Sequence, residues 1–252
     1  MHRFYVDPAA VEGHHILIRG LEAHHVATVL RLRPGDRCIA FDGTGLEYVV
    51  RLILVADTET IGEIEQRHTR ATVPLRLTLV QGVPKGTKMD LVIRMGTELG
   101  IGEFVPARTA RSVAGGAHRA ERWRRIAREA AKQSRRADVP EVREPAAFVD
   151  ALDGVRGADL IVVLWEGERG RTLADALRGR SVPAAAALIV GPEGGLERDE
   201  VEQAIAAGAV PVTLGPLILR TETAGIAAAA MLFYEFALRR PRQEEGRPSP
   251  NP

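Results

Sequence analysis

Hydrophobic and polar residues alternate in short runs over the first 70 residues of the chain. The runs cover residues 14–20, 36–43, 46–56 and 60–67, and Gly, Pro or Asp separates each from the next. Short strands at this spacing predict a small β-barrel. Between them, Val26, Val29 and Leu30 recur at helical spacing and a Pro-Gly-Asp turn follows at 34–36, so we expect a short helix there.

The pattern changes after residue 73, where apolar runs typical of buried strands alternate with helical segments. Candidate strands cover residues 75–83, 103–109, 159–167, 185–191 and 210–215. This order predicts an α/β fold with a mostly parallel sheet covered on both faces. We therefore expect a small barrel domain at 1–72, an α/β domain at 73–240, and a disordered tail at 241–252, which is rich in proline and polar residues.

One predicted helix, at 118–136, is strongly amphipathic. Its small and apolar residues fall on one stripe, formed by Trp123, Ile126, Ala127, Ala130, Ala131 and Ser134. Arginines occupy the other faces, so this helix can pack against the sheet and still present charge to a partner.

The net charge of +1 conceals a local excess of basic residues. Ten of the 29 residues from 108 to 136 are Lys or Arg and two are Glu, which gives this strip a charge of +8. Such a strip attracts phosphates and predicts contact with nucleic acid. The other interpretation is an ordinary solvated surface, because 31 arginines against three lysines can also reflect genome composition.

Several other classes of site are disfavoured. The single cysteine, Cys38, cannot form an internal disulfide and lies in a predicted strand, where it acts as a small apolar residue. The pairs His14-His15 and His24-His25 lack the spacing and carboxylates of a hydrolytic metal site, so we expect no metal. The chain also lacks a GxxxxGK[ST] phosphate loop and a GxGxxG dinucleotide motif.

We expect a cytoplasmic protein that does not contact a membrane. The apolar run at 224–238 is interrupted by Glu235 and is too short to cross a bilayer. The first 13 residues lack the basic and apolar segments of a signal peptide.

Two segments near the C-terminal end carry candidate chemistry. The first, Gly-Pro-Glu-Gly-Gly at 191–195, follows a predicted strand and precedes a helix that begins near Glu197. Glycines let the backbone approach a ligand, and loops at the carboxyl ends of parallel strands commonly bind small molecules. Because Glu193 repels phosphate, we expect a neutral or cationic ligand, with Glu193 bonded to a ribose hydroxyl or near a sulfonium.

In the second segment, residues 217–219 form an apolar bridge into an alanine-rich helix, which Thr221 or Thr223 can cap. An ordinary buried helix explains the alanines. It does not explain the polar cluster Arg220-Thr221-Glu222-Thr223 between two apolar runs.

These segments and several others resemble the RsmE family of 16S rRNA (uracil-N3)-methyltransferases, which belongs to the SPOUT class of trefoil-knotted methyltransferases. The resemblance covers nearly the whole sequence. The matching blocks, in order, are residues 3–7, 24–36, 41–48, 84–112, 129–142, 191–195 and 214–224.

The resemblance implies a PUA-like N-terminal barrel, a knotted C-terminal α/β domain, a homodimer, and S-adenosylmethionine as the methyl donor. In the family the donor lies bent between the two segments above and the end of an earlier strand. By position, the cofactor-binding candidates are Leu164, Glu166, Gly191, Glu193, Gly194, Leu214, Leu217, Ile218 and Leu219.

Methylation at uracil N3 requires loss of the imide proton and attack of the nitrogen on the sulfonium methyl. Arg220 is suited to stabilise negative charge on a uracil carbonyl oxygen. Glu222 is a candidate proton acceptor, or it stabilises the helix N-terminus instead. Glu98 is similarly ambiguous between an active-site role and an ion pair at a helix end.

N3 lies on the Watson-Crick edge, so the target uridine must be unpaired or flipped out of its stack. The barrel and the basic strip are expected to hold flanking 16S rRNA of the small ribosomal subunit. An aromatic content of 4% argues against a stacking platform. The RNA-binding candidates are Arg3, Arg31, Arg33, Arg108, Arg111, Arg135 and Arg136.

Two alternatives remain open at this stage. One is a SPOUT methyltransferase with a different target, such as a ribose 2′-hydroxyl. The other is a noncatalytic RNA-binding assembly factor, which would not bind S-adenosylmethionine.

Overall fold

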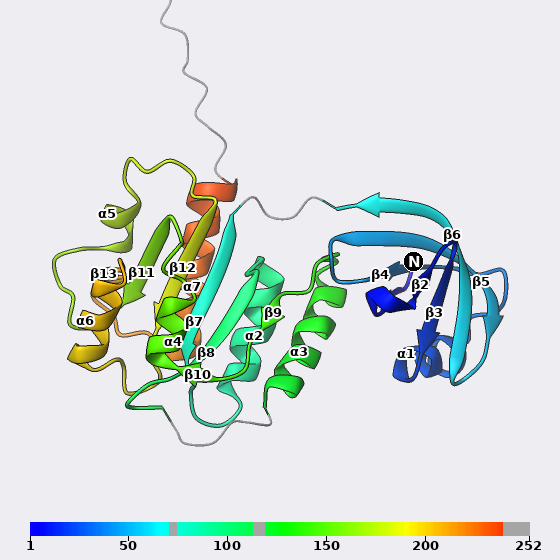
Figure 1. The fold of residues 1–252 in the computed structure, drawn as a ribbon, viewed down its shortest axis with the longest axis horizontal. Helices are drawn as coiled ribbons and strands as arrows, with labels where there is room; N and C mark the ends of the chain where they lie inside the picture. Colours follow the sequence, from blue (N-terminus) through cyan, green and yellow to red (C-terminus); the bar gives the residue numbers. More distant parts are fainter. Residues whose placement is uncertain (71–74, 113–118, 239–252) are drawn as a thin grey trace, which may run out of the picture.

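The computed structural model describes residues 1–70, 75–112 and 119–238. The N-terminal part is a curled six-stranded sheet in the order β1-β4-β5-β6-β3-β2 (Figure 1). Its strand pairs are antiparallel except for β1 with β4. The strands are β1 Arg3–Tyr5, β2 Val11–Glu12, β3 His15–Arg19, β4 Arg37–Phe41, β5 Leu46–Val55 and β6 Glu59–Thr69. The predicted strands of the barrel are confirmed.

The predicted short helix between these strands is present and begins before Val26. It consists of α1, Leu21–His24, and a π-helical turn, His25–Val29. Val26 is buried, but Val29 is 61% exposed, so the expected apolar face was wrong at that position. Cys38 is fully buried in β4, and burial raises the pKa of its thiol to about 12. The thiol is therefore protonated and acts as a core residue.

The second part is a parallel sheet in the order β10-β8-β7-β12-β11-β13, with β9 beside β8. Its strands are β7 Arg76–Gly82, β8 Glu103–Arg108, β9 Glu141–Val142, β10 Ala146–Ala147, β11 Leu160–Leu164, β12 Ala185–Val190 and β13 Val210–Val212. The helices are α2 Lys88–Leu99, α3 Ala120–Gln133, α4 Phe148–Asp153, α5 Leu173–Leu177, α6 Arg198–Ala206 and α7 Thr221–Phe233, which a π-helical turn at Tyr234–Leu238 continues.

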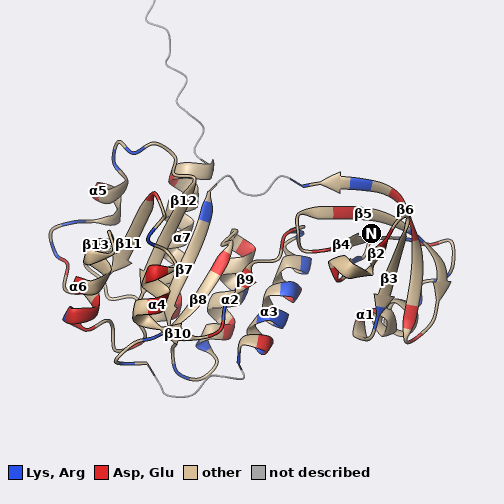
Figure 2. Cartoon of the chain, in the orientation of Figure 1, with Lys and Arg blue, Asp and Glu red and all other residues tan. Residues whose placement is uncertain are grey.

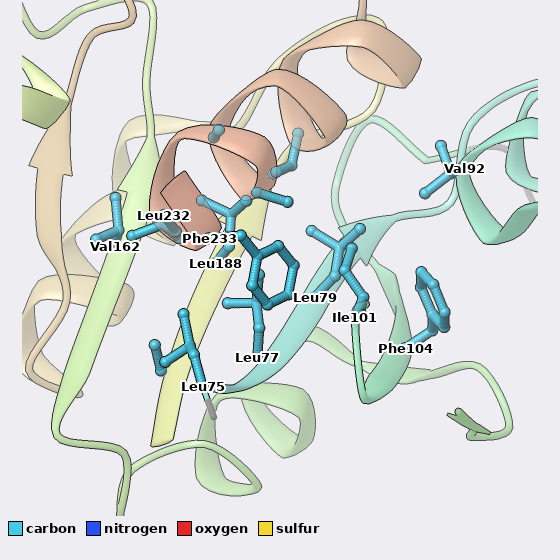
Figure 3. Close-up of a cluster of buried hydrophobic side chains, with 14 of the residues drawn as sticks. Leu75, Leu77, Leu79, Val92, Ile101, Phe104, Val162, Leu188, Leu232 and Phe233 are labelled. Atoms are coloured by element: carbon cyan, nitrogen blue, oxygen red, sulfur yellow. The ribbon is translucent and has the colours of Figure 1, made fainter. Parts of the chain in front are cut away.

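Both faces of this sheet are buried, as predicted. Alternate residues of β7 and β12, such as Leu79 and Leu188, pack with α2, α3 and α7 on one face (Figure 3). Their neighbours Val80 and Ile189 pack with α4 and α6 on the other. Strands that bury both faces read as continuous apolar runs, which is the pattern of 75–83 and 185–191. Among the described residues, no helix is both long and apolar enough to span a membrane.

Helix α3 lies between the sheet and the barrel (Figure 1). On the predicted stripe, Trp123, Ala127, Ala130 and Ala131 are buried, whereas Ile126 and Ser134 are half-buried. Lys and Arg positions are spread along its length (Figure 2).

The segment after α3 joins the two sheets. The backbone N–H of Val139 donates to the Gly43 carbonyl at 3.0 Å, and Lys132 pairs with Glu22 at 2.8 Å. Arg3 pairs with the buried Glu47. The Val139 and Lys132 contacts fix the barrel against α3 and the segment after it, whereas the Arg3–Glu47 pair lies within the barrel. The expected domain boundary near residue 73 and the expected tail at 241–252 both lie outside the described residues.

Candidate active site

A cavity of about 880 Å³ opens at the carboxyl ends of β11, β12 and β13. Its walls are the residues after β11, the Gly191–Gly195 loop after β12, the segment from Thr213 to Arg220 after β13, and the first turn of α7. The segments around Pro192 and Ile218, more than 20 positions apart in the sequence, therefore face one cavity. The volume and the position at the strand ends are typical of a ligand site in an α/β protein.

Most of the cofactor-binding candidates line this cavity. They are Leu164, Glu166, Gly191, Glu193, Leu214, Leu217, Ile218 and Leu219. Gly194 does not, because its carbonyl faces outward and accepts a hydrogen bond from Arg111 at 2.5 Å. Both catalytic candidates, Arg220 and Glu222, also line the cavity. The sequence interpretation missed Lys88 and Thr172 in the lining, although Lys88 belongs to a block that resembles the family.

The 191–195 loop requires glycine at two positions because neighbouring atoms lie where a Cβ atom would be. A Cβ atom on Gly191 would lie 2.8 Å from the carbonyl carbon of Gly195. Gly195 has φ +71°, and a Cβ atom there would lie 2.6 Å from Oε2 of Glu166. Any larger residue would displace backbone or the Glu166 carboxylate, so the loop keeps its shape only with glycine at these positions.

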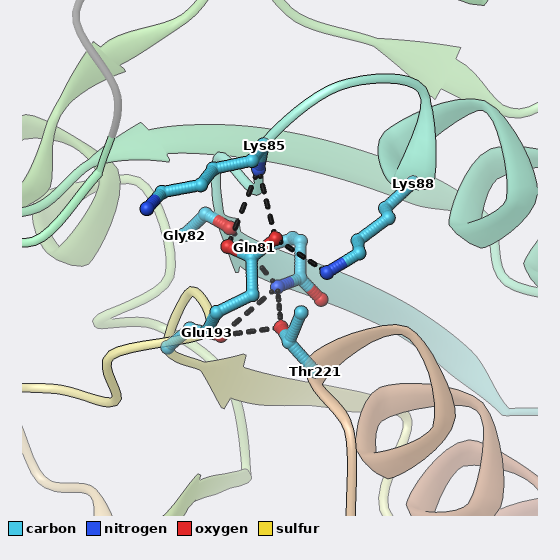
Figure 4. A network of polar contacts seen from close by, with 7 residues as sticks. Gln81, Gly82, Lys85, Lys88, Glu193 and Thr221 are labelled. Atoms are coloured by element: carbon cyan, nitrogen blue, oxygen red, sulfur yellow. Dashed lines mark hydrogen bonds and ion pairs between the residues drawn. The ribbon is translucent and has the colours of Figure 1, made fainter.

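The carboxylate of Glu193, an exposed residue that lines the cavity, is bound by Lys85 and Lys88 (Figure 4). The backbone N–H of Lys85 donates to its two oxygens at 3.0 and 3.2 Å, and the Lys88 ammonium donates at 2.7 Å. Burial alone would raise the pKa of Glu193, but the hydrogen bonds from Lys88 and the Lys85 backbone hold it below its usual range. Glu193 also lines the cavity, so its contact with a ribose hydroxyl or a sulfonium stays a prediction. Glu166 is exposed in the cavity and has no partner among the described residues.

The polar cluster at residues 220–223 lies at the first turn of α7, but its threonines do not cap the helix. The predicted threonine cap is wrong, because Arg220 is the N-cap residue and no side chain caps the helix. Thr221 is buried and its hydroxyl donates to the Gly191 carbonyl at 2.6 Å, while Thr223 is exposed. The guanidinium of Arg220 faces solvent at the cavity, without a partner in the described part of the chain.

Glu222 is the other unpaired group of this turn. Its Oε2 atom is buried and has no hydrogen-bond partner in the structure. A buried carboxylate oxygen without a partner is costly, and groups of this kind concentrate at functional sites. Glu98 lies elsewhere, since it is exposed near the far end of α2 and does not line the cavity.

The cavity lining carries both signs of charge as well as apolar surface: four Glu side chains line it, against Lys88, Arg169 and Arg220. Three of these carboxylates, Glu166, Glu168 and Glu222, have no ion-pair partner among the described residues, so the lining can accept a positively charged organic molecule. Leu217 and Ile218 add apolar surface, being 77% and 89% exposed. Over the ranges that the structure describes, no group of three or more His, Cys, Asp or Glu side chains is arranged to hold a metal.

The RNA-binding candidates separate into two groups. Arg3 and Arg136 are nearly buried at the junction between the sheets: Arg3 donates to Glu47 and to the Arg136 carbonyl, and the Arg136 guanidinium donates to the carbonyls of Thr97 and Ile101. Because both guanidinium groups are bound by other groups of the protein, we revise their expected role from RNA contact to structural support of the junction.

The remaining candidates are exposed. Arg108 donates to the Pro145 carbonyl, and Arg111 binds the 191–195 loop and Glu197. Arg31, Arg33 and Arg135 have exposed side chains with no partner among the described residues. These three are the arginines best placed for an incoming phosphate.

Comparison with known proteins assigns both parts of the chain. Residues 71–233 match the family model described as "RNA methyltransferase domain", and residues 18–61 match "RNA methyltransferase PUA domain". Ribosomal RNA small subunit methyltransferase E of Bacillus subtilis is 36% identical over 233 residues, covering 88% of this chain and 91% of that protein.

Solved structures agree. The crystal structure of ribosomal RNA small subunit methyltransferase E from Neisseria gonorrhoeae bound to S-adenosyl methionine superposes with a TM-score of 0.84 at 34% identity, covering 93% of this chain and 97% of that one. A putative methyltransferase from Legionella pneumophila, in complex with the cofactor SAM, is 28% identical with a TM-score of 0.82, covering 92% and 96% of the two chains. By sequence, by domain composition and by fold, the chain belongs to the ribosomal RNA small subunit methyltransferase E family.

Proposed function

We propose that this protein transfers the methyl group of S-adenosylmethionine to N3 of a uridine in 16S rRNA. The observation that carries the proposal is the single cavity in which the 191–195 loop, the apolar segment 214–219 and the unpaired Arg220 and Glu222 meet. Family membership supports the reaction class, and the described S-adenosyl methionine complex of the Neisseria relative supports the donor. The substrate locates the reaction in the cytoplasm.

The donor is held by the loop and the apolar segment. Backbone groups at Gly191 and Gly195 allow close approach of a ligand, and Leu217, Ile218 and Leu219 offer apolar surface to an adenine ring. The exposed carboxylate of Glu166 is the group placed to accept hydrogen bonds from ribose hydroxyls. When bound, S-adenosylmethionine supplies an electrophilic methyl group.

Arg220 and Glu222 act on the uracil. The Arg220 guanidinium lies at the cavity with its donors free, so it can bind a uracil carbonyl oxygen and stabilise the charge left when N3 loses its proton. The unpaired Oε2 atom of Glu222 can accept that proton. Both residues flank Thr221 at the start of α7, and both line the cavity beside the donor loop.

The barrel and α3 hold the RNA around the flipped uridine. We propose that residues 1–72 form the PUA-like RNA-binding domain and 73–240 the knotted methyltransferase domain, with the knot itself implied by the resemblance. The contacts of Lys132 and Arg3 across the junction make one continuous surface of the barrel and α3. Exposed arginines at both ends of it, Arg33 and Arg135, are available to phosphates.

Removal of both Arg33 and Arg135 is expected to weaken RNA binding and to lessen its dependence on salt. Each lost phosphate contact should reduce the slope of log K against log salt by about 0.7 to 0.9. The measurement is a titration with a small-subunit rRNA fragment at several salt concentrations. The matched control removes Arg178 and Arg198, which are 77% and 82% exposed on α5 and α6. Equal slopes in the two double variants would identify the basic strip as ordinary solvated surface.

We also propose a homodimer. Beyond the cavity, α7 and the turn that continues it expose the large apolar side chains of Met231, Tyr234 and Leu238. Apolar side chains gathered along one helix are typical of a surface that a partner covers. Sedimentation velocity should give the mass of two chains, and a monomer at micromolar concentration would exclude this assembly.

The reaction is tested with small ribosomal subunits from a strain that lacks its own methyltransferase of this family. The subunits are incubated with the protein and methyl-labelled S-adenosylmethionine, and the rRNA is digested to nucleosides for mass spectrometry. We expect labelled 3-methyluridine. A labelled 2′-O-methyl nucleoside would establish the ribose alternative. No labelled nucleoside, together with no heat of donor binding in calorimetry, would establish a noncatalytic RNA-binding protein.

A further inference from the structure

Gln81 is a polar residue in the core of the methyltransferase domain. It lies near the end of β7 and its side chain is fully buried. Its Nε2 atom lies within hydrogen-bond distance of three acceptors: the carbonyls of Gly82 at 3.1 Å and Gly191 at 3.2 Å, and the Thr221 hydroxyl at 2.9 Å (Figure 4). Because the amide has two N–H groups, one of them is shared between two of these acceptors. Thr221 in turn donates to the Gly191 carbonyl at 2.6 Å. Three segments distant in sequence thus meet at one amide.

The surrounding atoms determine which way the amide points. The two carbonyl oxygens near Nε2 can only accept, so the opposite orientation of the side chain would place three acceptors together. In the observed orientation Oε1 is buried without a partner, beside the backbone of α7, where a Cβ atom on Gly225 would lie 3.4 Å from it. Leaving that oxygen unpaired costs about 1 to 3 kcal/mol. An apolar residue at this position would avoid this cost. The benefit of a glutamine here therefore comes from the hydrogen bonds that Nε2 donates.

The contacts join the donor loop to the catalytic turn. Gly191 is the first residue of the 191–195 loop, and Thr221 stands between Arg220 and Glu222. No side chain caps α7, so within the described residues these hydrogen bonds are the polar side-chain contacts that hold its first turn against the loop.

We propose that Gln81 and Thr221 are positioning residues, which set the distance between the methyl donor and the two catalytic side chains. This inference rests on the proposed function and adds two buried residues that act through the loop and the first turn of α7: Gln81 lies behind the cavity wall and Thr221 is part of it. A displacement of about 1 Å between reacting groups can lower a rate about 100-fold, whereas donor affinity depends mainly on the loop and the apolar segment. The pair therefore acts on turnover more than on binding.

Three substitutions on α7 test the role of the Thr221 hydroxyl in positioning. Thr221→Val removes the hydroxyl at nearly constant volume, Thr221→Ser retains it, and Thr223→Val makes the same change at an exposed position on the same turn. We expect Thr221→Val to lower kcat about 30-fold or more with the donor Kd changed by less than about threefold, because the misplacement affects the transition state. Thr221→Ser and Thr223→Val should keep kcat within about threefold of the wild-type value.

Gln81→Met removes all three donations and retains the length of the side chain, and should lower kcat in the same way. Because both residues act through the Gly191 carbonyl, the loss in the double variant Gln81→Met, Thr221→Val should be smaller than the product of the single losses. If the two residues only stabilised the fold, their replacement would instead lower the melting temperature and raise the donor Kd while kcat stayed constant. That result, or multiplicative losses, would overturn the proposal.

A second measurement keeps this test separate from that of the proposed function. Hydrogen-deuterium exchange of the amides of residues 191–196 and 221–225 reports the contact without any turnover. Faster exchange in both segments of Thr221→Val, relative to Thr223→Val, is expected even if the wild-type protein methylates no RNA. Unchanged exchange together with unchanged kcat in a wild-type protein that does methylate RNA would reject the positioning role and leave the proposed function intact.

Discussion

Replacement of Arg220 by alanine is expected to lower turnover about 100-fold or more, the cost of removing one donor from a developing negative charge. The guanidinium lies at the cavity with no partner in the described part of the chain, so its loss breaks no contact of the resting protein. Donor affinity should stay within about threefold, because the loop and the apolar segment are untouched. Single-turnover methylation and calorimetry measure the two quantities separately.

The matched control is Arg178→Ala on α5, since this arginine is also exposed, at 77% of its side chain, and does not line the cavity. It should leave turnover unchanged. If Arg220→Ala methylated RNA as fast as the control, the guanidinium would have no part in the reaction. If it lost donor binding instead, Arg220 would belong to the cofactor site.

Glu222→Gln is expected to lower turnover by a similar factor, about 100-fold, if Glu222 is the proton acceptor. The amide has nearly the same shape as the carboxylate, and Oε2 has no partner to lose. The residual activity should increase with pH more steeply than that of the wild-type protein, because hydroxide then has to remove the imide proton. The pH dependence of single-turnover rates measures this change.

Glu98→Gln is the control for this substitution, because Glu98 is exposed on α2 outside the cavity. A parallel pH profile for Glu222→Gln and the wild-type protein would exclude Glu222 as the base. A lower melting temperature with unchanged kinetics would show that Glu222 instead stabilises the N-terminus of α7 through the helix dipole.

The sequence predicted most elements of the fold because their patterns are local. The runs at 75–83 and 185–191 became β7 and β12, since buried parallel strands are apolar on both faces. The stripe of α3 was visible from spacing alone. The short helix near Val29 was less predictable, because which of its residues are covered depends on the strands that pack against it.

The sequence predicted the position of the site better than it predicted which charged side chains are free to bind a ligand. Arg3 and Arg136 look like RNA ligands in the sequence, yet Arg3 donates to the Arg136 carbonyl across the junction and the Arg136 guanidinium donates to the Thr97 carbonyl at the end of α2. Glu193 looks like a free carboxylate, yet Lys85 and Lys88 bind it. Apart from Asp138 beside Arg136, these partners are distant in the sequence: the Arg136 carbonyl is 133 positions from Arg3, Thr97 is 39 from Arg136, and Lys85 and Lys88 are more than 100 from Glu193, so no local pattern reveals them.

The amino-acid sequence by itself determined the two-part architecture, the family, and the two segments that line the cavity, because periodicity and ordered motif blocks are properties of neighbouring residues. Only the tertiary structure decided which polar groups are free to bind ligands and which are bonded to other groups of the protein. A hydrogen bond such as that from Gln81 to Thr221, 140 positions apart, exists only after packing has brought the strands and helices together.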